Sequence, residues 1–481
     1  MSARSGSARE RVHRLLAKQI KKFPDLEIAE LDTTGLDARD AALAHHIYDT
    51  VLRRWLTITH LLSMSLEVPW EDMNPKVGAP LMAAVAQMVF MDKVPVHAAV
   101  DEAVQAAKLA GQRSAGLANA VLRGLLRQLG ATQGEVEDPD THGEPREQSL
   151  HDARPYEKRA TWGAGWNEVP ADDGGALGFR RDVLPKDPME ALSIATSHGI
   201  DVLRMWSKHF PKTEVRRLAQ HGLANAPVIL NTAHATAPLP EEGLEAHNVP
   251  GHHVWTGSHE GLVALLDSRS DLWVQDPASS LAVSSVSDLA PEVVIDMCAG
   301  MGTKTRQLAA TFPNAEIITT DVDLPRQATL REAFAGHPGR RVKVVEYTKL
   351  REHAGRADLV MLDVPCSNTG VLARRVEARY RFDRGRSEKL MSVQKQIIAD
   401  AIPLLKAGGP GAGSGAGAGK RRGAILYSTC SLDPSENGDQ VRWAAKWHMF
   451  KVTREKQTLP QGGPGKPVSA YTDGSYAALL Q

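Results

Sequence analysis

The sequence predicts a multidomain protein, in which an all-α N-terminal domain precedes an α/β domain with a mainly parallel sheet. The chain has 481 residues, enough for two or three domains, each with its own core. Apolar residues recur at spacings of three and four in the first quarter of the chain, which is typical of amphipathic helices. Short apolar runs alternate with helical patterns in the last two fifths, which is typical of βαβ units.

The N-terminal domain is expected to span residues 1–129. Helical spacing is clearest in 38–62, 97–111 and 116–129, and no alternating strand pattern interrupts it. The sequence therefore predicts a small all-helical domain.

Two segments of different character follow. Residues 130–186 are rich in Gly, Pro, Asp, Glu and His and poor in aliphatic clusters, so we expect a flexible linker there. Residues 187–275 combine a helical stretch at 200–210 with short apolar segments at 227–232 and 271–276. This mixture predicts a small α+β connecting domain.

The α/β domain is expected to span residues 276–481. The expected strands are 292–297, 316–321, 341–346, 357–363 and 423–429, and the expected helices between them are 303–312, 324–336 and 390–405. A glycine-rich insert, 408–422, precedes the last of these strands. It ends in Gly-Lys but lacks the first glycine of a P-loop, and Arg421 replaces the Ser/Thr, so a phosphate-binding P-loop is rejected.

Composition excludes several classes of protein. The formal net charge is zero, so only local patches can attract nucleic acid. No apolar run reaches membrane-spanning length, and the basic N-terminus lacks the apolar core of a secretory signal. The three cysteines fit a reducing cytoplasm, and their spacing does not suit a metal site. We therefore expect a cytoplasmic monomer without a metal or membrane partner.

A nucleotide-type ligand site is expected after the first strand of the α/β domain. The turn 298-CAGMGTKT-305 places Gly300 and Gly302 before a helix, where backbone passes close to a ligand and free N–H groups are available. Asp321 closes the second strand, where an acid reaches ribose hydroxyls in related folds. Because the pattern is not GxGxxG, a single adenosine-type cofactor fits better than a dinucleotide.

Two cysteines follow strands at the same edge of the predicted sheet. Cys366 comes after Asp363 and Pro365, and Cys430 lies between Thr429 and Ser431. Buried structural cysteines are common, but ligands bind at this edge of an α/β sheet. A thiolate there can attack an electron-poor carbon such as C6 of cytosine, which makes C5 nucleophilic. Two cysteines and an aspartate would serve as nucleophile, release residue and proton donor.

These motifs together resemble the NOP2/Sun family of RNA cytosine-5 methyltransferases, in particular its bacterial RsmB (Sun/Fmu) branch. The resemblance rests on Asp-x-Pro-Cys-Ser, on Thr-Cys-Ser followed by Pro434, Glu436 and Asn437, on 274-VQDPASSLAV-283 and on 473-DGSYAALL-480. It also covers 90–127, which is similar to a NusB-like RNA-binding domain. It implies a Rossmann-like methyltransferase domain, S-adenosyl-L-methionine as cofactor, and small-subunit ribosomal RNA (16S rRNA) as partner.

The resemblance also implies roles for individual residues. Cys430 would attack C6, Cys366 would assist product release, Asp363 would help to protonate N3, and Lys304 would be a catalytic-site lysine. The cofactor would be held by the loop and acids, namely Cys298, Ala299, Gly300, Met301, Gly302, Thr303, Lys304, Asp321, Glu346 and Asp363. The basic segment 374–389, with Tyr380 and Phe382 interleaved, suits RNA, and its expected contacts are Arg374, Arg375, Arg379 and Arg381. A solvated basic loop is the alternative for this segment.

Three positions depart from the family pattern. Met301-Gly302-Thr303 replaces Pro-Gly-Gly in the cofactor loop, Asn368 stands where a small residue is usual, and Glu346 or Tyr347 replaces an aspartate after the third strand. These departures leave two alternatives open. A DNA cytosine-5 methyltransferase would use Cys366 as its nucleophile, and a non-catalytic RNA-binding or ribosome assembly factor would not bind the cofactor.

Overall fold

The computed structural model describes residues 7–27, 29–129, 154–336, 341–407 and 423–481, and the backbone of two short paired strands, β1 (Glu135–Glu137) and β2 (Pro145–Glu147). The chain divides into two compact units, residues 1–225 with 375–381 and residues 226–374 with 382–481. The glycine-rich insert 408–422 and most of the predicted linker before residue 154 lie outside the described residues.

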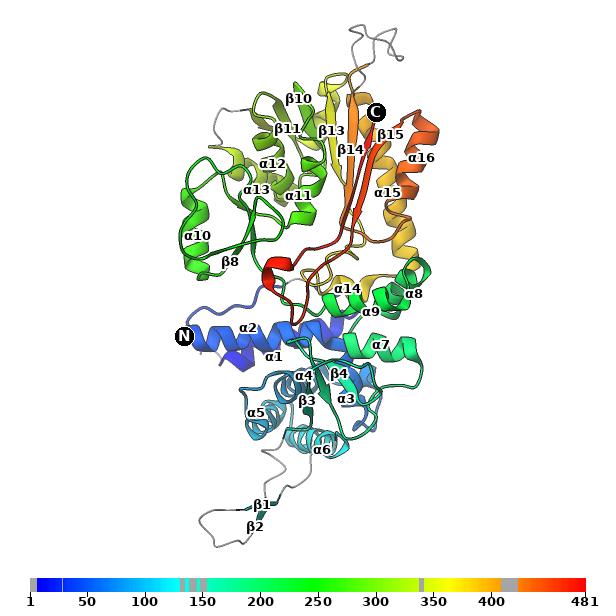
Figure 1. Ribbon diagram of the computed structural model, residues 1–481. Coiled ribbons are helices and arrows are strands. Elements are labelled where there is room, and N and C mark those ends of the chain that lie inside the picture. Colours follow the sequence, from blue (N-terminus) through cyan, green and yellow to red (C-terminus); the bar gives the residue numbers. More distant parts are fainter. Residues whose placement is uncertain are drawn as a thin grey trace. The chain divides into compact units, whose positions relative to one another are not determined.

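The first unit begins with helices, coloured blue to cyan in Figure 1. They are α1 (Ala8–Lys22), α2 (Ala38–Arg53), α3 (Trp55–Ser63), α4 (Pro75–Phe90), α5 (Val96–Lys108) and α6 (Gln112–Gln128). A capping box between Ser7 and Glu10 starts α1, and helix α4 is buried from Val77 to Val89 as the centre of the bundle. The predicted all-helical N-terminal domain is confirmed.

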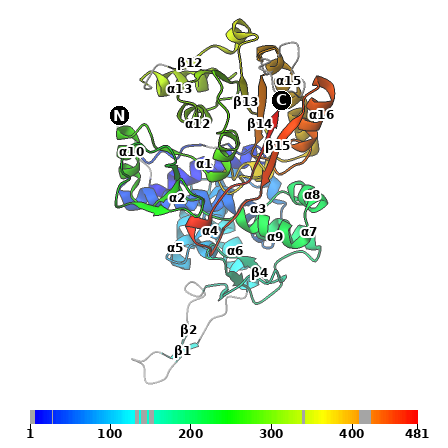
Figure 2. The ribbon, with the colours of Figure 1, turned by 45° about the horizontal axis from the view of Figure 1, so that its top comes forward.

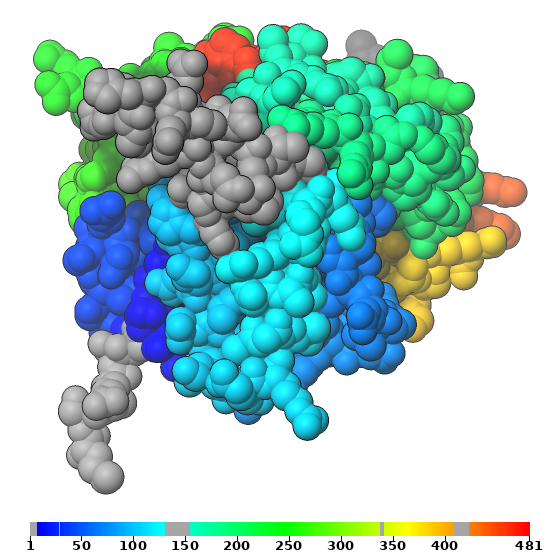
Figure 3. All heavy atoms as spheres, turned by 90° about the horizontal axis from the view of Figure 1, so that it is seen from below, coloured from blue at the N-terminus to red at the C-terminus, as the bar shows by residue number. Residues whose placement is uncertain are grey.

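Residues 154–186 differ from the predicted flexible linker. They contain an antiparallel sheet in the order β3 (Glu157–Arg159), β5 (Ala176–Gly178), β4 (Glu168–Pro170). Their few apolar side chains, including Trp162, Val169 and Phe179, join the core of the helical bundle. In Figure 3 the turquoise residues of this part lie beside the cyan helices on one face. The composition suggested a linker because this segment has few apolar residues. Composition does not report that nearly all of them point into the core.

The predicted connecting domain 187–275 is divided between the two units. Helices α7 (Pro188–Thr196), α8 (Ile200–His209) and α9 (Lys212–His221) belong to the first unit. The second unit takes the antiparallel sheet β7 (Leu244–Ala246), β8 (His252–Trp255), β6 (Ile229–Asn231), β9 (Trp273–Val274), and helix α10 (His259–Ser268). Helical and strand segments were both predicted there, but their separation depends on packing with distant parts of the chain.

A seven-stranded sheet forms the centre of the second unit. Its order is β12 (Val342–Val344), β11 (Glu316–Thr319), β10 (Val293–Asp296), β13 (Leu359–Asp363), β14 (Ala424–Thr429), β16 (Ser475–Leu480), β15 (Val452–Thr458). The first five strands are parallel, and β16 is antiparallel to both of its neighbours. The predicted α/β domain is confirmed, and all five predicted strands are present within two residues of their expected bounds at either end.

Helices cover both faces of this sheet, because successive side chains of a strand point to opposite faces. In β13, Leu359 and Met361 pack in one cluster with α11 (Pro277–Ser284) and α12 (Thr303–Thr311). Val360 and Leu362 pack in another with α15 (Arg384–Ala401) and α16 (Gly438–His448). Figure 2 shows α15 and α16 together on one side of the sheet. Helix α13 (Leu324–Phe334) follows β11. The loops that carry the cysteines follow β13 and β14, at the carboxyl ends of the parallel strands, where ligands bind in α/β sheets.

Candidate active site

The register of two neighbouring strands brings Cys366 and Cys430 together. Strands β13 and β14 are parallel, and Asp363 pairs with Ser428 at their carboxyl ends. Cys366 lies three residues beyond the first of these residues, and Cys430 two beyond the second. The two Sγ atoms are 3.3 Å apart, so the predicted juxtaposition of the cysteines is present.

The two thiols have different surroundings. Cys366 is buried, whereas Cys430 is partly exposed. The hydrogen bond to Cys430 and the burial of the side chain raise the pKa of Cys366 well above the ordinary value of a thiol. Cys366 therefore stays protonated near neutral pH and is able to donate its S–H to Cys430, which favours Cys430 as the more nucleophilic of the two.

Asn368 connects both cysteine loops. Its Oδ1 accepts from Cys430 Sγ at 3.2 Å, and its Nδ2 donates to the Cys366 carbonyl at 3.1 Å. The residue has φ 61°, the left-handed region that asparagine tolerates better than most residues. This departure from the family pattern thus has a local structural reason.

A buried carboxylate holds the two cysteine loops in register. Glu436 accepts the backbone N–H of Ser367 at 2.9 Å, the Ser431 hydroxyl at 2.6 Å, and a hydrogen bond from the Ser367 hydroxyl. Gln394 of α15 donates to the same carboxylate at 3.2 Å. Burial raises the pKa of Glu436, and the serine donors oppose this effect. Ser367 and Ser431 directly follow the two cysteines, so Glu436 fixes both loops to one point.

Backbone contacts bring the loops still closer. Gly370 donates its N–H to the Cys430 carbonyl at 2.8 Å. A Cβ atom at Gly370 would meet that carbonyl oxygen at 2.7 Å and the Gly474 carbonyl oxygen at 2.9 Å. Only glycine fits at this position.

Lys304 and Asp363 form an ion pair near the cysteines. The Lys304 ammonium lies 2.8 Å from Asp363 Oδ2 and 3.2 Å from Ser279 Oγ, and Ser428 donates to Asp363 Oδ1 at 3.1 Å. Burial alone would lower the pKa of Lys304, but the Asp363 carboxylate outweighs it and holds that pKa above its ordinary value. Lys304 is therefore a cation that orients Asp363 at the end of β13.

The loop after β10 has the shape of a ligand cradle. Gly300 and Gly302 adopt φ of +56° and +86°, and a Cβ at Gly300 would meet nothing within 4 Å. Asp321 accepts the Gly300 N–H at 2.8 Å and the Asp323 N–H at 3.0 Å, which places its carboxylate against this loop. An open glycine, the N-terminus of α12 and a carboxylate at the end of the next strand fit a nucleoside with an amino-acid tail.

The remaining predicted cofactor residues lie around the same loop or beyond β12. Ala299 donates its N–H to the Thr320 carbonyl at 3.0 Å, and Cys298 is partly exposed with its pKa raised well above the ordinary value, mainly by burial. Met301 is 62% exposed. Glu346 follows β12 and pairs with Lys349 at 3.5 Å, so its carboxylate is engaged on the surface.

Two of the arginines predicted to bind RNA have other partners. Arg379 is fully buried in the first unit, where it donates to the Arg53 carbonyl at 2.9 Å, and burial lowers its pKa to about 9. A buried guanidinium cannot reach an RNA phosphate, so this prediction is wrong. Tyr380 is likewise buried, with its hydroxyl 2.6 Å from the Leu52 carbonyl, and is not available for base stacking.

Arg374 is held by carboxylates in the second unit. Its guanidinium lies 2.6 Å from Asp473 and 3.1 Å from Asp276, and both acids are buried. Burial raises the pKa of Asp473 to about 7 and also raises that of Asp276. Arg374 therefore ties the chain after the Cys366 loop to the start of α11, and the structure does not support it as an RNA contact.

Arg375 and Arg381 remain partly exposed on the first unit. Both pair with the buried Glu377, at 3.8 Å and 3.0 Å respectively. Their side chains are 50% and 38% exposed. An RNA contact by these two stays a prediction.

Sequence reasoning missed two buried acids of the site. Asp296, at the end of β10, accepts from Thr305 Oγ1 at 2.6 Å, and burial raises its pKa to about 7. Glu436 was noted as part of a motif, but not as the point that joins the two loops. The signal for Glu436 was its place after Cys430, at the start of a helix that packs on the same strands.

The described residues hold neither a cluster of metal ligands nor a membrane-spanning helix. They contain no group of three or more His, Cys, Asp or Glu that could hold a metal ion. None of the helices described is long and apolar enough to cross a membrane.

Comparisons with known proteins agree with this arrangement. Residues 287–481 match the family model for 16S rRNA methyltransferase RsmB/F, and residues 7–127 match the NusB family. The chain is 26% identical to the ribosomal RNA small subunit methyltransferase B of Vibrio cholerae over 413 residues, 84% of this chain and 81% of that protein. It is 26% identical to the protein of that name from Erwinia tasmaniensis over 462 residues, 92% of this chain and 91% of that protein.

A solved structure has the same fold. The crystal structure of PH0851 matches with a TM-score of 0.65 and 18% identity, and the match covers 100% of both chains. The two family models account for both the helical bundle and the seven-stranded sheet. The cofactor of the methyltransferase region is S-adenosylmethionine. The chain therefore joins a region that matches the NusB family, residues 7–127, to a region that matches the family model for 16S rRNA methyltransferase RsmB/F, residues 287–481.

Proposed function

We propose that this protein methylates C5 of a cytosine in small-subunit ribosomal RNA, with Cys430 as the covalent nucleophile. The observation that carries the proposal is the pair of thiols, 3.3 Å apart at the ends of adjacent parallel strands. Simple methyl transfer to an oxygen or a nitrogen requires no thiol. Two adjacent thiols, one buried and one partly exposed, suit the activation and release of a pyrimidine ring. The names of the two relatives described above, both ribosomal RNA small subunit methyltransferase B, support the choice of RNA.

The cofactor residues are proposed from the same edge of the sheet. The loop Cys298–Lys304 and Asp321 would hold S-adenosylmethionine, which supplies an electrophilic methyl group when bound. Asp363 stands between this loop and the cysteines through its ion pair with Lys304. Glu346 is the weakest member of the proposed set, because its carboxylate pairs with a surface lysine.

Cys430, Asp363 and Cys366 would act on the cytosine ring in successive steps. The Cys430 thiolate forms a bond to C6, and the electron pair of the C5–C6 double bond moves toward N3, where Asp363 assists protonation. C5 then becomes nucleophilic and would accept the methyl group as the bond between that methyl group and the sulfur of the cofactor breaks. The C5 proton then leaves to solvent and the N3 proton returns to Asp363, so that the C5–C6 double bond re-forms as the bond between C6 and Cys430 breaks and releases the thiolate. Cys366, protonated and in contact with Cys430, is placed to assist this release.

The assignment of the nucleophile distinguishes this proposal from a DNA-type enzyme. In that alternative Cys366 would attack, but Cys366 is buried and its pKa is raised well above the ordinary value. Cys430 is the more exposed thiol and is able to accept a hydrogen bond from its neighbour. The structure thus favours Cys430.

The test is methyl transfer from labelled S-adenosylmethionine to protein-free small-subunit ribosomal RNA, followed by digestion to nucleosides. The proposal predicts label only in 5-methylcytidine. Label in a base other than cytosine, or in DNA and not RNA, would reject it. No transfer and no cofactor binding would point to a non-catalytic RNA-binding factor instead.

A further inference from the structure

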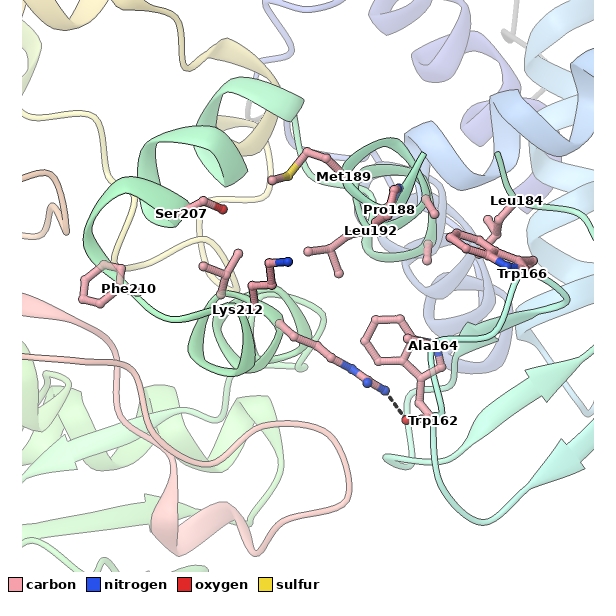
Figure 4. A pocket seen from close by; sticks show the side chains of 14 residues that line it. Trp162, Ala164, Trp166, Leu184, Pro188, Met189, Leu192, Ser207, Phe210 and Lys212 are labelled. Atoms are coloured by element: carbon pink, nitrogen blue, oxygen red, sulfur yellow. Dashed lines mark hydrogen bonds between the residues drawn. The ribbon is translucent and has the colours of Figure 1, made fainter. Parts of the chain in front are cut away.

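The first unit contains a cavity that lies outside both matched family regions. It has a volume of about 470 Å³ and is lined by residues 162–216, between the regions 7–127 and 287–481. Helices α7, α8 and α9 and the loops around the β3–β5–β4 sheet surround it (Figure 4). Its volume is in the range of ligand sites, about 300–1,000 Å³.

Helical spacing creates two of its walls. Pro188 and Leu192 lie on one face of α7, and Lys212, Val215 and Arg216 lie on one face of α9. In Figure 4, Leu192 and Lys212 face each other across the hollow. Apolar and cationic side chains therefore share the same cavity.

Two indoles form another part of the lining. Trp162 and Trp166 lie in the connection between β3 and β4; Trp162 is buried and Trp166 is partly exposed. Figure 4 shows both on the side away from Phe210. Indoles offer flat, apolar surfaces on which any nucleobase can stack.

The charges of the lining are all of one sign. Lys212 and Arg216 line the cavity, and no carboxylate does. The Arg216 guanidinium lies over the Trp162 ring at 4.4 Å, and the Lys186 ammonium lies over the Trp166 ring at 5.7 Å. Lys186 also pairs with Asp182, but Lys212 forms no ion pair within the described part of the chain. This lining is complementary to an anion that carries an aromatic or apolar body.

We propose that the cavity binds an unpaired nucleotide of single-stranded RNA, with the base against the indoles and the phosphate against Lys212 and Arg216. A guanidinium stacked on an indole is itself a platform for a base. An apolar protein side chain would fill the hollow but would leave both cations without an anion. That this RNA is the ribosomal substrate rests on the proposed function. That the cavity binds single-stranded RNA does not.

The test measures binding of the full-length protein to a labelled single-stranded RNA of about a dozen nucleotides by fluorescence anisotropy. Trp166→Ala is expected to weaken binding by about tenfold, because stacking of one base is worth roughly 1–3 kcal/mol. Lys212→Glu is expected to weaken binding and to reduce the slope of log affinity against log salt by about 1 or more.

Matched controls make the same chemical changes elsewhere. Lys208 is exposed on α8 and does not line the cavity, and Trp447 is 64% exposed on α16. Lys208→Glu and Trp447→Ala should bind RNA with an affinity within about twofold of the wild type. This difference is much smaller than the roughly tenfold loss, about 1.4 kcal/mol, expected for Trp166→Ala. Lys212 is also exposed, so Lys212→Glu keeps the fold even if Trp166→Ala loosens the core.

The outcomes separate this proposal from the proposed function. Wild-type methyl transfer combined with unchanged RNA binding by Trp166→Ala and Lys212→Glu overturns the cavity proposal alone, and an apolar protein side chain then becomes the occupant to test. Weakened RNA binding by both variants supports the cavity proposal even if the wild type transfers no methyl group, a result that would reject only the enzymatic function.

Discussion

Glu436 offers a quantitative test of how the two cysteine loops are held. In Glu436→Ala, the backbone N–H of Ser367, the hydroxyls of Ser367 and Ser431, and the Gln394 amide lose their common acceptor. Each buried donor left without an acceptor costs about 1–3 kcal/mol, and removal of one partner from a buried charged network costs about 3–5 kcal/mol. We therefore expect the free energy of unfolding of the second unit to fall by about 3–5 kcal/mol.

Glu436→Gln is the matched control. Its carbonyl oxygen can still accept from the Ser367 N–H and Gln394, and its NH₂ group can donate to the two serine hydroxyls, which are able to reverse their direction. The loss of stability should then be less than about 1.5 kcal/mol, the net contribution of a single hydrogen bond. The difference in stability between Glu436→Ala and Glu436→Gln thus measures what the hydrogen-bonded side chain contributes, apart from the effect of removing its negative charge.

The assay combines stability with a local reporter. Urea unfolding gives the change in free energy, and hydrogen–deuterium exchange of the peptide that contains Ser367 reports the protection of its backbone N–H. Single-turnover methyl transfer should fall by about 100-fold in Glu436→Ala, because a misplacement of about 1 Å has effects of that size. Equal stability, protection and rate in Glu436→Ala and the wild type would refute this account of the loops.

Three further predictions concern single positions. Burial raises the pKa of Asp296 from 3.8 to about 7, so its contribution to stability is fully present below about pH 4 and is lost as pH rises through about 7. By urea unfolding, the wild type should lose about 3 kcal/mol more stability between pH 5 and pH 8 than Asp296→Asn does, and parallel curves would contradict this. Gly370→Ala should lower the melting temperature and the methyl-transfer rate sharply, because its Cβ meets the Cys430 carbonyl at 2.7 Å, whereas Gly336→Ala, with nothing within 4 Å, should change neither. Asn368→Ala should destabilise the protein by about 1–2 kcal/mol more than Asn368→Gly, because only glycine adopts φ 61° without strain; equal effects would show that the left-handed conformation does not matter.

The sequence predicted the elements of the active site because their signals are local. Apolar runs that end in Asp363 and Thr429 indicated strands, and parallel strands place their carboxyl ends at one edge, so the meeting of Cys366 and Cys430 followed. The capped helices of the first unit were predictable for the same reason. The distance between the thiols depends on register, which the sequence does not specify.

Long-range packing explains the errors. Arg379 was expected on the surface because it stands in a basic segment, but residues 375–381 pack within the first unit, where a carbonyl of a residue more than 300 positions away accepts from its guanidinium. Arg374 looked like a phosphate contact because its two carboxylate partners, Asp276 and Asp473, lie far from it in the sequence. The folding of residues 154–186 depends in the same way on a core supplied by other helices.

The most direct measurement is the identity of the residue that becomes covalently attached to RNA. Cys366→Ala, incubated with S-adenosylmethionine and small-subunit ribosomal RNA, is analysed by denaturing electrophoresis and peptide mapping. We predict a denaturant-stable protein–RNA complex with the RNA attached to Cys430, and neither complex nor methyl transfer in Cys430→Ala. An RNA adduct on Cys366, or methyl transfer that survives Cys430→Ala, would contradict the central claim that Cys430 is the nucleophile.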